Sequence, residues 1–229
     1  MIEAACQVDY RLDTIFYTER WYTSHSWLGE KLAAKSCQLQ PVSTEVLTAI
    51  ATTMNPDGVV AIAPLNARQL PQVTQTKLSI ALERLQDPGN LGTIIRSAVA
   101  VGVDGLWLSR DSVDIYNPKV LRASVGQWFR LPMATEQNLQ ELIVQHRQQG
   151  NQIIATTAQA DKTYWEVDFT RPSLILLGNE GAGLSPELIA LADKQVQIPL
   201  ANGVESLNVA IASALLLYEA KRQLEQLKK

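Results

Sequence analysis

Two loops near the end of the chain, the first of them rich in glycine, hold residues suited to chemistry. Residues 178–183 read GNEGAG, with three glycines around one carboxylate, Glu180. Glycine lets main-chain N–H and C=O groups approach a ligand closely, so this loop can hydrogen-bond a planar or polar molecule without intervening side chains. A second loop, 201–205, leads to Ser206 and Asn208. Together the loops favour a ligand held by backbone atoms beside a few polar side chains.

The helix that starts after Ser206 has no polar side. Between Leu207 and Tyr218 only Asn208 and Ser213 are polar, and a helix that is apolar all round is buried in a core or an interface. It is shorter than the roughly 20 residues that a bilayer crossing needs. Ser206 and Asn208 keep two interpretations, since serine and asparagine are favoured helix caps as well as ligand-binding groups.

A third candidate, Arg96, belongs to a strand–loop–helix unit. The expected strand is 78–82, the loop reads DPGNLGT at 87–93, and the expected helix is 91–101, ended by Gly102. This order places a polar ligand at a helix N-terminus. The spacing of Gly89 and Gly92 matches neither a dinucleotide fingerprint nor a P-loop, which excludes the usual nucleotide-dependent oxidoreductase.

Arg96 lies outside the apolar face of its helix. That face is predicted to consist of Leu91, Ile94, Ile95 and Ala98. Gly92 and Ala100, one turn away on either side of Arg96, would let another backbone approach closely. Arg96 is either a solvated charge or an interface or site residue. Lys119, Arg122 and Arg130 can join it in a basic patch for phosphates, although Lys119 and Arg122 also fit the solvated face of a helix.

The positions of these loops follow from an alternation of strands and helices. In residues 1–63 we expect strands at 14–17, 39–42 and 59–63 and helices at 24–35 and 43–52, forming a small α/β unit. Residues 64–76 read as a linker. In residues 77–229 the further strands are 105–108, 152–156, 174–177 and 196–198, and the further helices are 119–125, 136–149, one from Ser185-Pro186, and the last. The prediction is an α/β fold with a mostly parallel sheet covered by helices on both faces.

Composition excludes several classes of site. The 229 residues carry a formal charge of −3 with a pI near 5.5, so binding of nucleic acid must be local. Two cysteines and two histidines without metal-type spacing leave no zinc site or histidine triad, and we expect no metal. The start, MIEAACQVDYRLD, lacks the regions of a signal peptide, which predicts a cytoplasmic protein. The aromatics Trp21, Tyr22 and Trp27 either stack on RNA bases or pack in a core.

Three blocks carry a family resemblance. LERLQDPGNLGTIIRSAVAVG (82–102), LILLGNEGAGLSPE (174–187) and IPLANGVESLNVAIASALLLYEAKRQ (198–223) resemble, in order, the three motifs of SpoU-type RNA 2′-O-ribose methyltransferases of the SPOUT superfamily. Residues 1–63 resemble the small L30e-like RNA-binding domain that precedes the catalytic domain in rRNA-modifying members, abbreviated at its start. The resemblance covers both expected units.

The resemblance implies a cofactor, an assembly and a substrate. The cofactor is S-adenosylmethionine, bound at a C-terminal trefoil knot, and the protein is a homodimer with its active site at the interface. By position, the cofactor-binding residues are Leu177, Gly178, Asn179, Gly183, Ile198, Leu200, Ser206 and Leu207. The substrate is structured RNA, with 23S rRNA favoured over tRNA because of the extra N-terminal unit. The alternatives are a tRNA 2′-O-methyltransferase or a non-catalytic RNA-binding or ribosome-assembly factor of the same fold.

The resemblance also assigns catalytic positions, which are Asn90, Arg96, Glu180, Ser206 and Asn208. An arginine pKa above about 12 makes a neutral base costly, so we prefer Arg96 as an anchor for the adjacent phosphate and a stabiliser of the developing alkoxide, with base action second. Glu180 either orients Arg96 across the dimer or holds its loop by accepting main-chain N–H bonds. Asn90 and Asn208 position either the ribose or their own loops.

Overall fold

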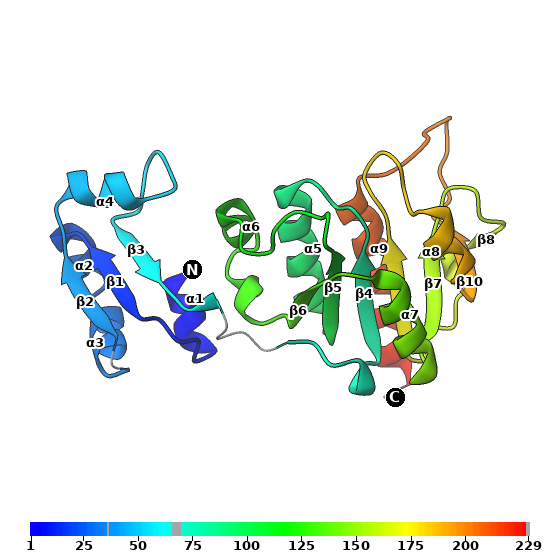
Figure 1. Ribbon diagram of the computed structural model, residues 1–229, viewed down its shortest axis with the longest axis horizontal. Helices are drawn as coiled ribbons and strands as arrows, with labels where there is room; N and C mark the ends of the chain where they lie inside the picture. The colour runs from blue at the N-terminus through cyan, green and yellow to red at the C-terminus, as the bar shows by residue number, and fades with distance from the viewer. Residues whose placement is uncertain (36, 66–69, 228–229) are drawn as a thin grey trace. The chain divides into compact units, whose positions relative to one another are not determined.

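The structure is a computed structural model that describes residues 1–35, 37–65 and 70–227. The chain divides into two compact units, Met1–Arg68 and Gln69–Lys229 (Figure 1). Residues 66–69 of the predicted linker lie outside the described residues. Within the described ranges, none of the helices has both the length and the apolarity that crossing a bilayer requires.

The N-terminal unit packs short helices on a three-stranded sheet. In the order β2-β1-β3, β2 is parallel and β3 antiparallel to β1. The strands are β1 Thr14–Tyr17, β2 Gln38–Pro41 and β3 Val59–Ile62, and the helices are α1 Ile2–Gln7, α2 Glu19–Ser24, α3 Ser26–Ala33 and α4 Thr44–Ile50. The three predicted strands and the helix at 43–52 are confirmed, with ends shifted by a residue or two.

The helix predicted at 24–35 is confirmed as α3, with ends shifted by two residues, but the preceding helix α2 was not predicted. The Thr18 side chain accepts a hydrogen bond from the Trp21 N–H, so α2 begins at Glu19, before the predicted start. The helical path then breaks at His25, whose φ of −133° and ψ of 33° are not helical, and resumes as α3. A threonine cap in an aromatic-rich stretch therefore decided the boundary.

The aromatic cluster resolves mainly into core packing. Trp21 is 7% exposed, lies in the hydrophobic core of this unit, and stacks on His25 with ring centroids 4.8 Å apart. Tyr22 stacks on Tyr17 at 4.9 Å. Base stacking is therefore the wrong interpretation for Trp21, whereas Trp27 is 51% exposed.

The C-terminal unit is built on a seven-stranded sheet in which every pairing is parallel. Its order is β6-β5-β4-β9-β7-β10-β8. The strands are β4 Leu78–Leu82, β5 Gly105–Ser109, β6 Met133–Glu136, β7 Gln152–Thr156, β8 Lys162–Thr163, β9 Ser173–Leu177 and β10 Lys194–Gln197. Since the strands are parallel, their carboxyl ends lie along one edge of the sheet, and the loops that follow β4, β7, β9 and β10 gather there.

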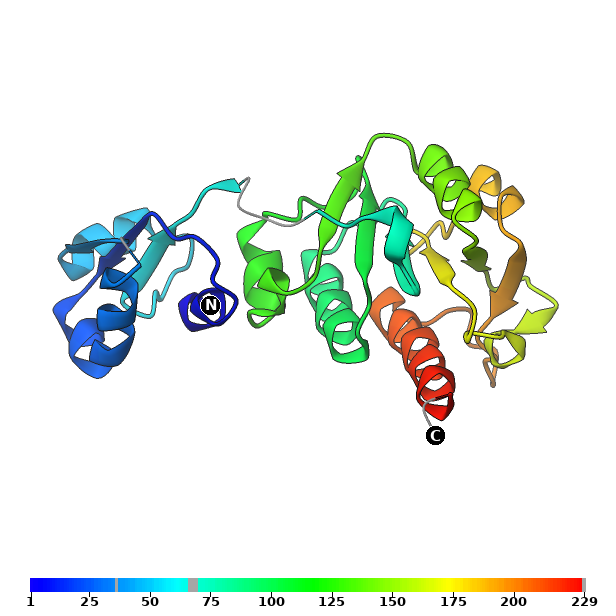
Figure 2. The ribbon, with the colours of Figure 1, turned by 90° about the horizontal axis from the view of Figure 1, so that it is seen from below.

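Helices cover both faces of this sheet, as predicted. The helices are α5 Pro88–Val101, α6 Pro118–Ala123, α7 Leu139–Gln148, α8 Pro186–Ala190 and α9 Val209–Gln226, with short 3-10 turns η2 Val73–Gln75, η3 Gln127–Phe129 and η4 Tyr164–Glu166. Figure 2 shows α5, α6 and α9 on one face and α7 and α8 on the other, and α5 contacts both α6 and α9. The faces of β4, β5, β7 and β9 are almost entirely buried, which explains their continuous apolar runs.

The helix predicted at 136–149 is wrong at its beginning. Residues 133–136 form the edge strand β6, and Asn138 caps α7 by accepting hydrogen bonds from the Gln140 and Glu141 N–H groups. Only the first residue of the four-residue strand is buried, and its polar Thr135 and Glu136 run directly into the polar start of the helix. The short strand β8 was likewise not predicted.

His146 on α7 is a buried histidine. It is fully buried, contacts the edge of Trp107 with ring centroids 4.8 Å apart, and neither ring nitrogen has a hydrogen-bond partner among the described residues. Burial lowers the pKa of His146 from 6.5 to about 4. The folded chain therefore keeps this ring neutral in a pH range where an unfolded chain protonates it.

Acidification below neutral pH should therefore destabilise the protein. The contribution of the neutral His146 ring to the free energy of unfolding is fully present above pH 6.5 and is lost as the pH falls toward about 4. The reason is that, in this range, the unfolded state binds a proton that the folded state does not. The loss amounts to about 3 kcal/mol across that window. Urea unfolding followed by circular dichroism at several pH values should show this slope, and His146→Leu should flatten it. An equally steep slope in the variant would contradict the assignment.

Candidate functional site

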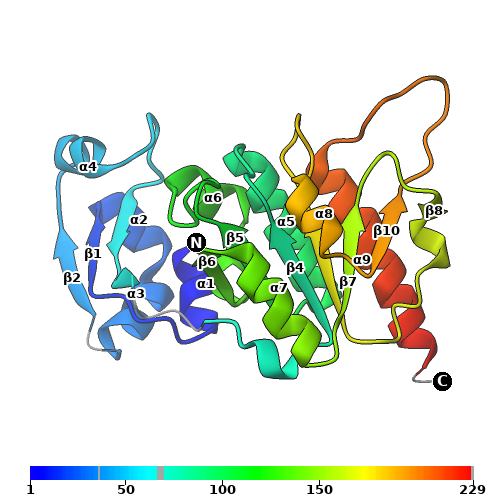
Figure 3. The ribbon, with the colours of Figure 1, turned by 45° about the vertical axis from the view of Figure 1, so that its right-hand side comes forward.

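A cavity opens at the carboxyl edge of the parallel sheet in the C-terminal unit. This edge cavity has a volume of about 510 Å³. Loops after β7, β9 and β10 and the start of α9 form its walls, and Figure 3 shows these loops rising from the same edge. The structure brings all eight predicted cofactor positions to its lining, namely Leu177, Gly178, Asn179, Gly183, Ile198, Leu200, Ser206 and Leu207. These residues are far apart in sequence, and they come together because the carboxyl ends of the parallel strands lie along one edge of the sheet.

The glycine loop, residues 178–184, folds tightly on itself. Asn179 and Gly183 pair through two main-chain hydrogen bonds of 3.1 and 3.0 Å. A Cβ on Gly178 would lie 2.0 Å from the Gly183 carbonyl carbon, so only glycine fits at position 178. Gly183 has φ +68°, a left-handed conformation that favours glycine. These two glycines allow the loop to present its backbone to the cavity.

Glu180 holds the glycine loop against the loop after β4. Its carboxylate accepts hydrogen bonds from the Gln86 N–H at 3.3 Å, the Asp87 N–H at 3.1 Å and the Asn90 Nδ2 at 3.1 Å. Partial burial alone raises the pKa of Glu180, but these hydrogen bonds outweigh it and hold the pKa below its ordinary value. Two roles were considered for Glu180, orienting Arg96 across a dimer and accepting hydrogen bonds from main-chain N–H groups. The single chain shows the second.

Asn90 and Asn208 extend the same network to the last helix. Asn208 Nδ2 donates to Asn90 Oδ1 at 2.8 Å, and Asn90 in turn donates to Glu180. Asn208 also caps α9, because its Oδ1 accepts hydrogen bonds from the Ala210 and Ile211 N–H groups. The capping interpretation therefore holds for Asn208, whereas Ser206 is exposed and lines the edge cavity.

Arg96 lies outside the edge cavity of its own chain. It is exposed on α5, six residues after Asn90 and so about 9 Å further along the helix. The predicted apolar face of α5 is confirmed, since Leu91, Ile94, Ile95 and Ala98 are all fully buried. The close approach expected beside Arg96 occurs at Gly92, where a Cβ would lie 2.3 Å from the Ala123 Cβ of α6. Arg96 itself remains on the open flank of α5.

That flank of α5 borders an apolar groove on α9. The α9 groove has a volume of about 490 Å³ and is lined by Thr93, Tyr164, Ala210, Ile211, Ala214, Leu215, Tyr218 and Glu219. Thr93 is one turn before Arg96 on the same side of α5. Ile211, Leu215 and Tyr218 are 53%, 37% and 52% exposed. The side of α9 that packs in its own chain is buried, as predicted, whereas the apolar side chains that face the groove are exposed.

The other predicted basic residues lie beside α5. Lys119 and Arg122 are exposed on α6, and Arg130 is exposed just after η3. Both elements contact α5. The fold thus places them on the same face of the sheet as Arg96, although they do not line the edge cavity.

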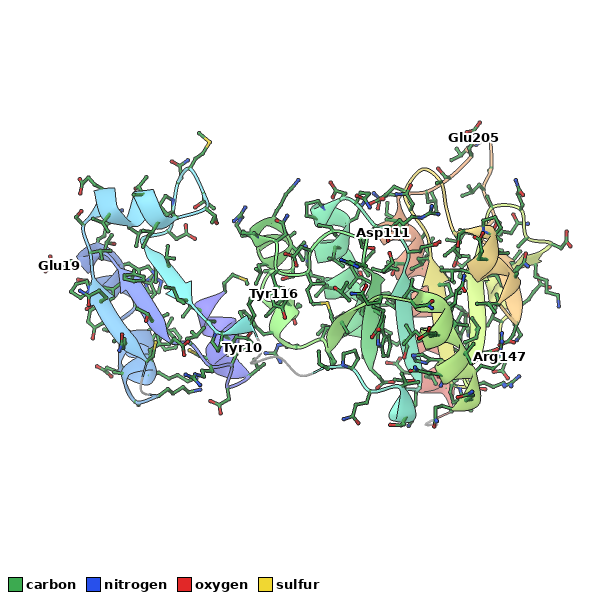
Figure 4. All side chains as sticks on the ribbon, viewed as in Figure 1. Tyr10, Glu19, Asp111, Tyr116, Arg147 and Glu205 are labelled. Carbon is green, nitrogen blue, oxygen red and sulfur yellow. The ribbon has the colours of Figure 1, made fainter. Side chains whose placement is uncertain are left out.

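The charge of the edge cavity suits a positively charged ligand. Glu180 and Glu205 are among its lining residues, and no lysine, arginine or histidine of the described chain is. Figure 4 shows Glu205 and Asp111 at the carboxyl edge of the sheet, with Arg147 toward its other end. Two carboxylates at the rim of a partly apolar cavity attract a cation.

Sequence reasoning missed one wall of the cavity. The missed lining residues are Thr156, Thr157, Ala158, Gln159, Gly181, Ala182, Leu184, Ile189, Glu205, Val209 and Ala212. Thr156 ends a strand that was predicted and residues 157–159 follow it, and polar residues at the end of a parallel strand are a usable signal for a site. The missing information was that β7 neighbours both β9 and β10. Among the described residues, no group of histidine, cysteine and acidic side chains could hold a metal ion.

Comparison with known proteins identifies both units. Residues 77–218 match the model of the SpoU rRNA Methylase family, and residues 1–67 match that of the RNA 2′-O ribose methyltransferase substrate binding domain. An uncharacterized tRNA/rRNA methyltransferase of Synechocystis is 48% identical, covering 90% of this chain and 76% of the relative. A 23S rRNA (guanosine-2′-O)-methyltransferase of Bacillus subtilis is 32% identical, covering 80% of this chain and 73% of the relative.

Solved structures match to different extents. The AdoMet-bound rRNA methyltransferase of Sinorhizobium meliloti has a TM-score of 0.85 at 33% identity, covering 97% of this chain and 84% of that one. The TrmH/SpoU tRNA modifying enzyme of A. aeolicus has a TM-score of 0.62 at 30% identity, covering 69% of this chain and 80% of that one.

The Asn208 side chain should stabilise the fold by two separable contacts. Asn208→Ala removes both the α9 cap and the bond to Asn90, and should lower the free energy of unfolding by about 1 kcal/mol or more. Asn208→Ser keeps a capping oxygen but loses the donor to Asn90, so its loss should be smaller. Thermal unfolding of the two variants measures the difference. Equal stability of the alanine variant and the wild type would show that the cap contributes nothing.

Proposed function

The chain belongs to the SpoU rRNA methylase family of RNA 2′-O-methyltransferases, and we propose that it methylates a ribose 2′-hydroxyl of 23S rRNA. The observation that carries the proposal is the edge cavity, with its backbone-rich glycine loop at the carboxyl ends of parallel strands. S-adenosylmethionine, when bound, supplies a methyl group on a sulfonium. The residues of this chain must hold that donor, align the ribose hydroxyl and assist loss of its proton.

The edge cavity fits such a donor in size, shape and charge. A volume of about 510 Å³ is within the range of small-molecule sites. Gly178 and Gly183 bring main-chain atoms to its surface. The carboxylates of Glu180 and Glu205 suit a sulfonium. Leu177, Gly178, Ile198, Leu200, Ser206 and Leu207 would hold the cofactor, with Asn179 shaping the glycine loop.

The position of Arg96 supports a homodimer with shared active sites. Arg96 is displaced from the cavity of its own chain and stands beside the α9 groove, whose exposed side chains are apolar. A second copy of the chain that covers the groove would bury Ile211, Leu215 and Tyr218 and bring the Arg96 of one subunit toward the cavity of the other. Arg96 would then bind the phosphate next to the target ribose and stabilise the developing alkoxide. Glu180 acts by fixing the glycine loop.

The C-terminal trefoil knot belongs to the same proposal. β9 enters the sheet between β4 and β7, and the chain then passes through β10 and returns as α9 to pack on α5. Both loops that would be threaded, 178–184 and 199–208, meet at the edge cavity. A knot would keep their backbones in fixed relation around the donor.

Coverage by the compared structures supports rRNA over tRNA. The rRNA methyltransferase of S. meliloti covers 97% of the chain, including the N-terminal unit, whereas the tRNA modifying enzyme of A. aeolicus covers 69%. The N-terminal unit is matched to the substrate-binding domain, and we infer that it is the part that distinguishes them. The C-terminal unit would add RNA contacts of its own, because its basic residues Lys119, Arg122 and Arg130 would bind phosphates.

Mapping 2′-O-methyl groups in cellular RNA with and without the gene tests the substrate and Arg96 together. Deletion should remove methylation at a site in 23S rRNA, and the wild-type gene should restore it. Arg96→Ala should fail to restore it while purified protein keeps its affinity for S-adenosylmethionine, because Arg96 does not line the cavity. Arg147→Ala, on α7, is the matched loss of charge and should restore methylation. Loss of a methylated site in tRNA instead would overturn the proposed substrate. Loss of no site would favour a non-catalytic factor. Restored methylation by Arg96→Ala would overturn the proposed role of Arg96.

Introducing a charge into the α9 groove should separate the subunits. Ile211→Asp places a carboxylate at a position that is 53% exposed in the single chain, so each chain should still fold. Burial of an unpaired charge in the dimer should convert the protein to monomers and reduce methyl transfer at least a hundredfold. Sedimentation velocity measures the assembly. Val144→Asp on α7, where the valine is 41% exposed, is the control and should stay dimeric. A monomeric wild type would contradict the proposal.

A further inference from the structure

A turn at the end of β5 holds the neighbouring loop after β4. Residues 109–112, called the β5 turn below, close through a hydrogen bond of 3.0 Å from the Ser112 N–H to the Ser109 carbonyl. The Ser109 Oγ accepts the Arg84 N–H at 2.8 Å, and the Ser112 Oγ accepts the Leu85 N–H at 3.1 Å. Two serine hydroxyls thus hold two successive main-chain groups of the loop after β4.

The hydroxyl hydrogens of the β5 turn also have acceptors. The Ser109 Oγ donates to the Asp111 Oδ1 at 2.6 Å and lies 3.0 Å from the Ser112 Oγ. Because a hydroxyl has only one hydrogen to donate, Ser112 must be the donor in the second contact. The hydrogen bonds of the turn therefore run in one direction, toward the Asp111 carboxylate, and leave both serine oxygens as acceptors for the neighbouring loop.

Arg84 has a backbone conformation that depends on such contacts. Its φ is +53°, in the left-handed region that is uncommon for residues other than glycine. A conformation of this kind persists when the surrounding structure fixes it. In addition to the bond from its N–H to Ser109, the Arg84 carbonyl accepts hydrogen bonds from Asn179 Nδ2 at 2.8 Å and Gln86 Nε2 at 3.1 Å. The β5 turn and the glycine loop therefore anchor the two main-chain polar groups of Arg84 from different sides.

The loop after β4 leads directly into the helix that carries two candidate site residues. It ends at Asp87, whose side chain caps α5 by accepting the Asn90 N–H at 2.8 Å. Asn90 bonds to Glu180, and Arg96 follows on the same helix. No residue of 83–101 lines the edge cavity. A displacement of this segment would therefore move Asn90 and Arg96 without removing a wall of the cavity.

Resting on the proposed function, we infer that Ser109 is a positioning residue for methyl transfer. Its hydroxyl fixes the Arg84 N–H and thereby sets the place of the loop from which α5 begins. Ser109 does not line the edge cavity, so it acts through Asn90 and Arg96 rather than on the donor. Reaction rates are sensitive to small misplacements of aligned groups, so loss of the hydroxyl should slow transfer while donor binding is kept.

Asp104 offers a matched contact at the other end of the same two strands. It precedes β5, and its Oδ2 accepts the Lys77 and Leu78 N–H groups at the start of β4, at 2.6 and 3.0 Å. Like Ser109, it joins the two strands by accepting main-chain N–H groups with a side-chain oxygen. Because β4 and β5 are parallel, this contact lies at the amino edge of the sheet, opposite the edge cavity.

The experiment measures methyl transfer from tritiated S-adenosylmethionine to ribosomal RNA of a strain that lacks the gene. Ser109→Ala should lower kcat about tenfold or more, while calorimetry should show an unchanged affinity for S-adenosylmethionine. Ser109→Thr keeps the hydroxyl and should keep the wild-type kcat. Asp104→Ala should lower the unfolding temperature at least as much as Ser109→Ala, because two N–H groups lose their acceptor, and should keep the wild-type kcat.

The outcomes separate this inference from the proposed function. If the wild-type protein transfers no methyl group to ribosomal RNA, the proposed function fails and the inference fails with it. If the wild type is active and Ser109→Ala keeps its kcat, the inference alone is wrong. An equal loss of kcat in Asp104→Ala would show that general destabilisation is the cause, and an equal loss in Ser109→Thr would show that the hydroxyl is not the active group. Either result, or a weaker affinity of Ser109→Ala for S-adenosylmethionine, would overturn the inference.

Discussion

The acceptance of two main-chain N–H groups by the Glu180 carboxylate is the contact on which the site depends. It joins the loop after β9 to the loop after β4, across 93 and 94 residues of sequence. Through Asn90 the same carboxylate reaches Asn208 and thus the first turn of α9. Three segments that are remote in sequence are therefore held in register by side chains acting as structural acceptors and donors. Two further hydrogen bonds, from Asn179 Nδ2 to the Arg84 carbonyl and from the Ser185 N–H to the Glu83 carboxylate, hold the glycine loop against the same neighbour.

Local physics accounts for the features that the sequence predicted well. The apolar runs of β4, β7 and β9 mark strands buried on both faces, and Asn117-Pro118 and Ser185-Pro186 mark helix starts that the structure shows. The glycines of 178–183 predicted a backbone-rich loop, and Gly178 indeed has no room for a side chain. Each of these signals is contained within a few residues, so no knowledge of the fold was required.

The features that sequence reasoning missed are set by contacts between distant segments. Residues 156–159 form a cavity wall only because β7 lies between β9 and β10, and strand order is not written in any local pattern. The edge strand β6 has few neighbours to enforce an apolar pattern, and it was not predicted; its last residue, Glu136, was assigned to the following helix. The all-apolar pattern of α9 could not distinguish a core from an interface, and the helix in fact presents Val209 and Leu216 to the first and Ile211 and Tyr218 to an open groove.

One helix, α9, therefore serves several tasks along its length. Val209 and Ala212 line the edge cavity, Ile211 and Leu215 line the α9 groove, and Gln223 near the other end binds the main chain of Phe169 and Val167. If the edge cavity binds the proposed donor and the α9 groove binds the proposed second chain, the same helix borders both sites, and a ligand that binds the dimer and the monomer with different affinity links the two equilibria. If a ligand strengthens association of the two chains by a given factor, the associated form binds that ligand more tightly by the same factor.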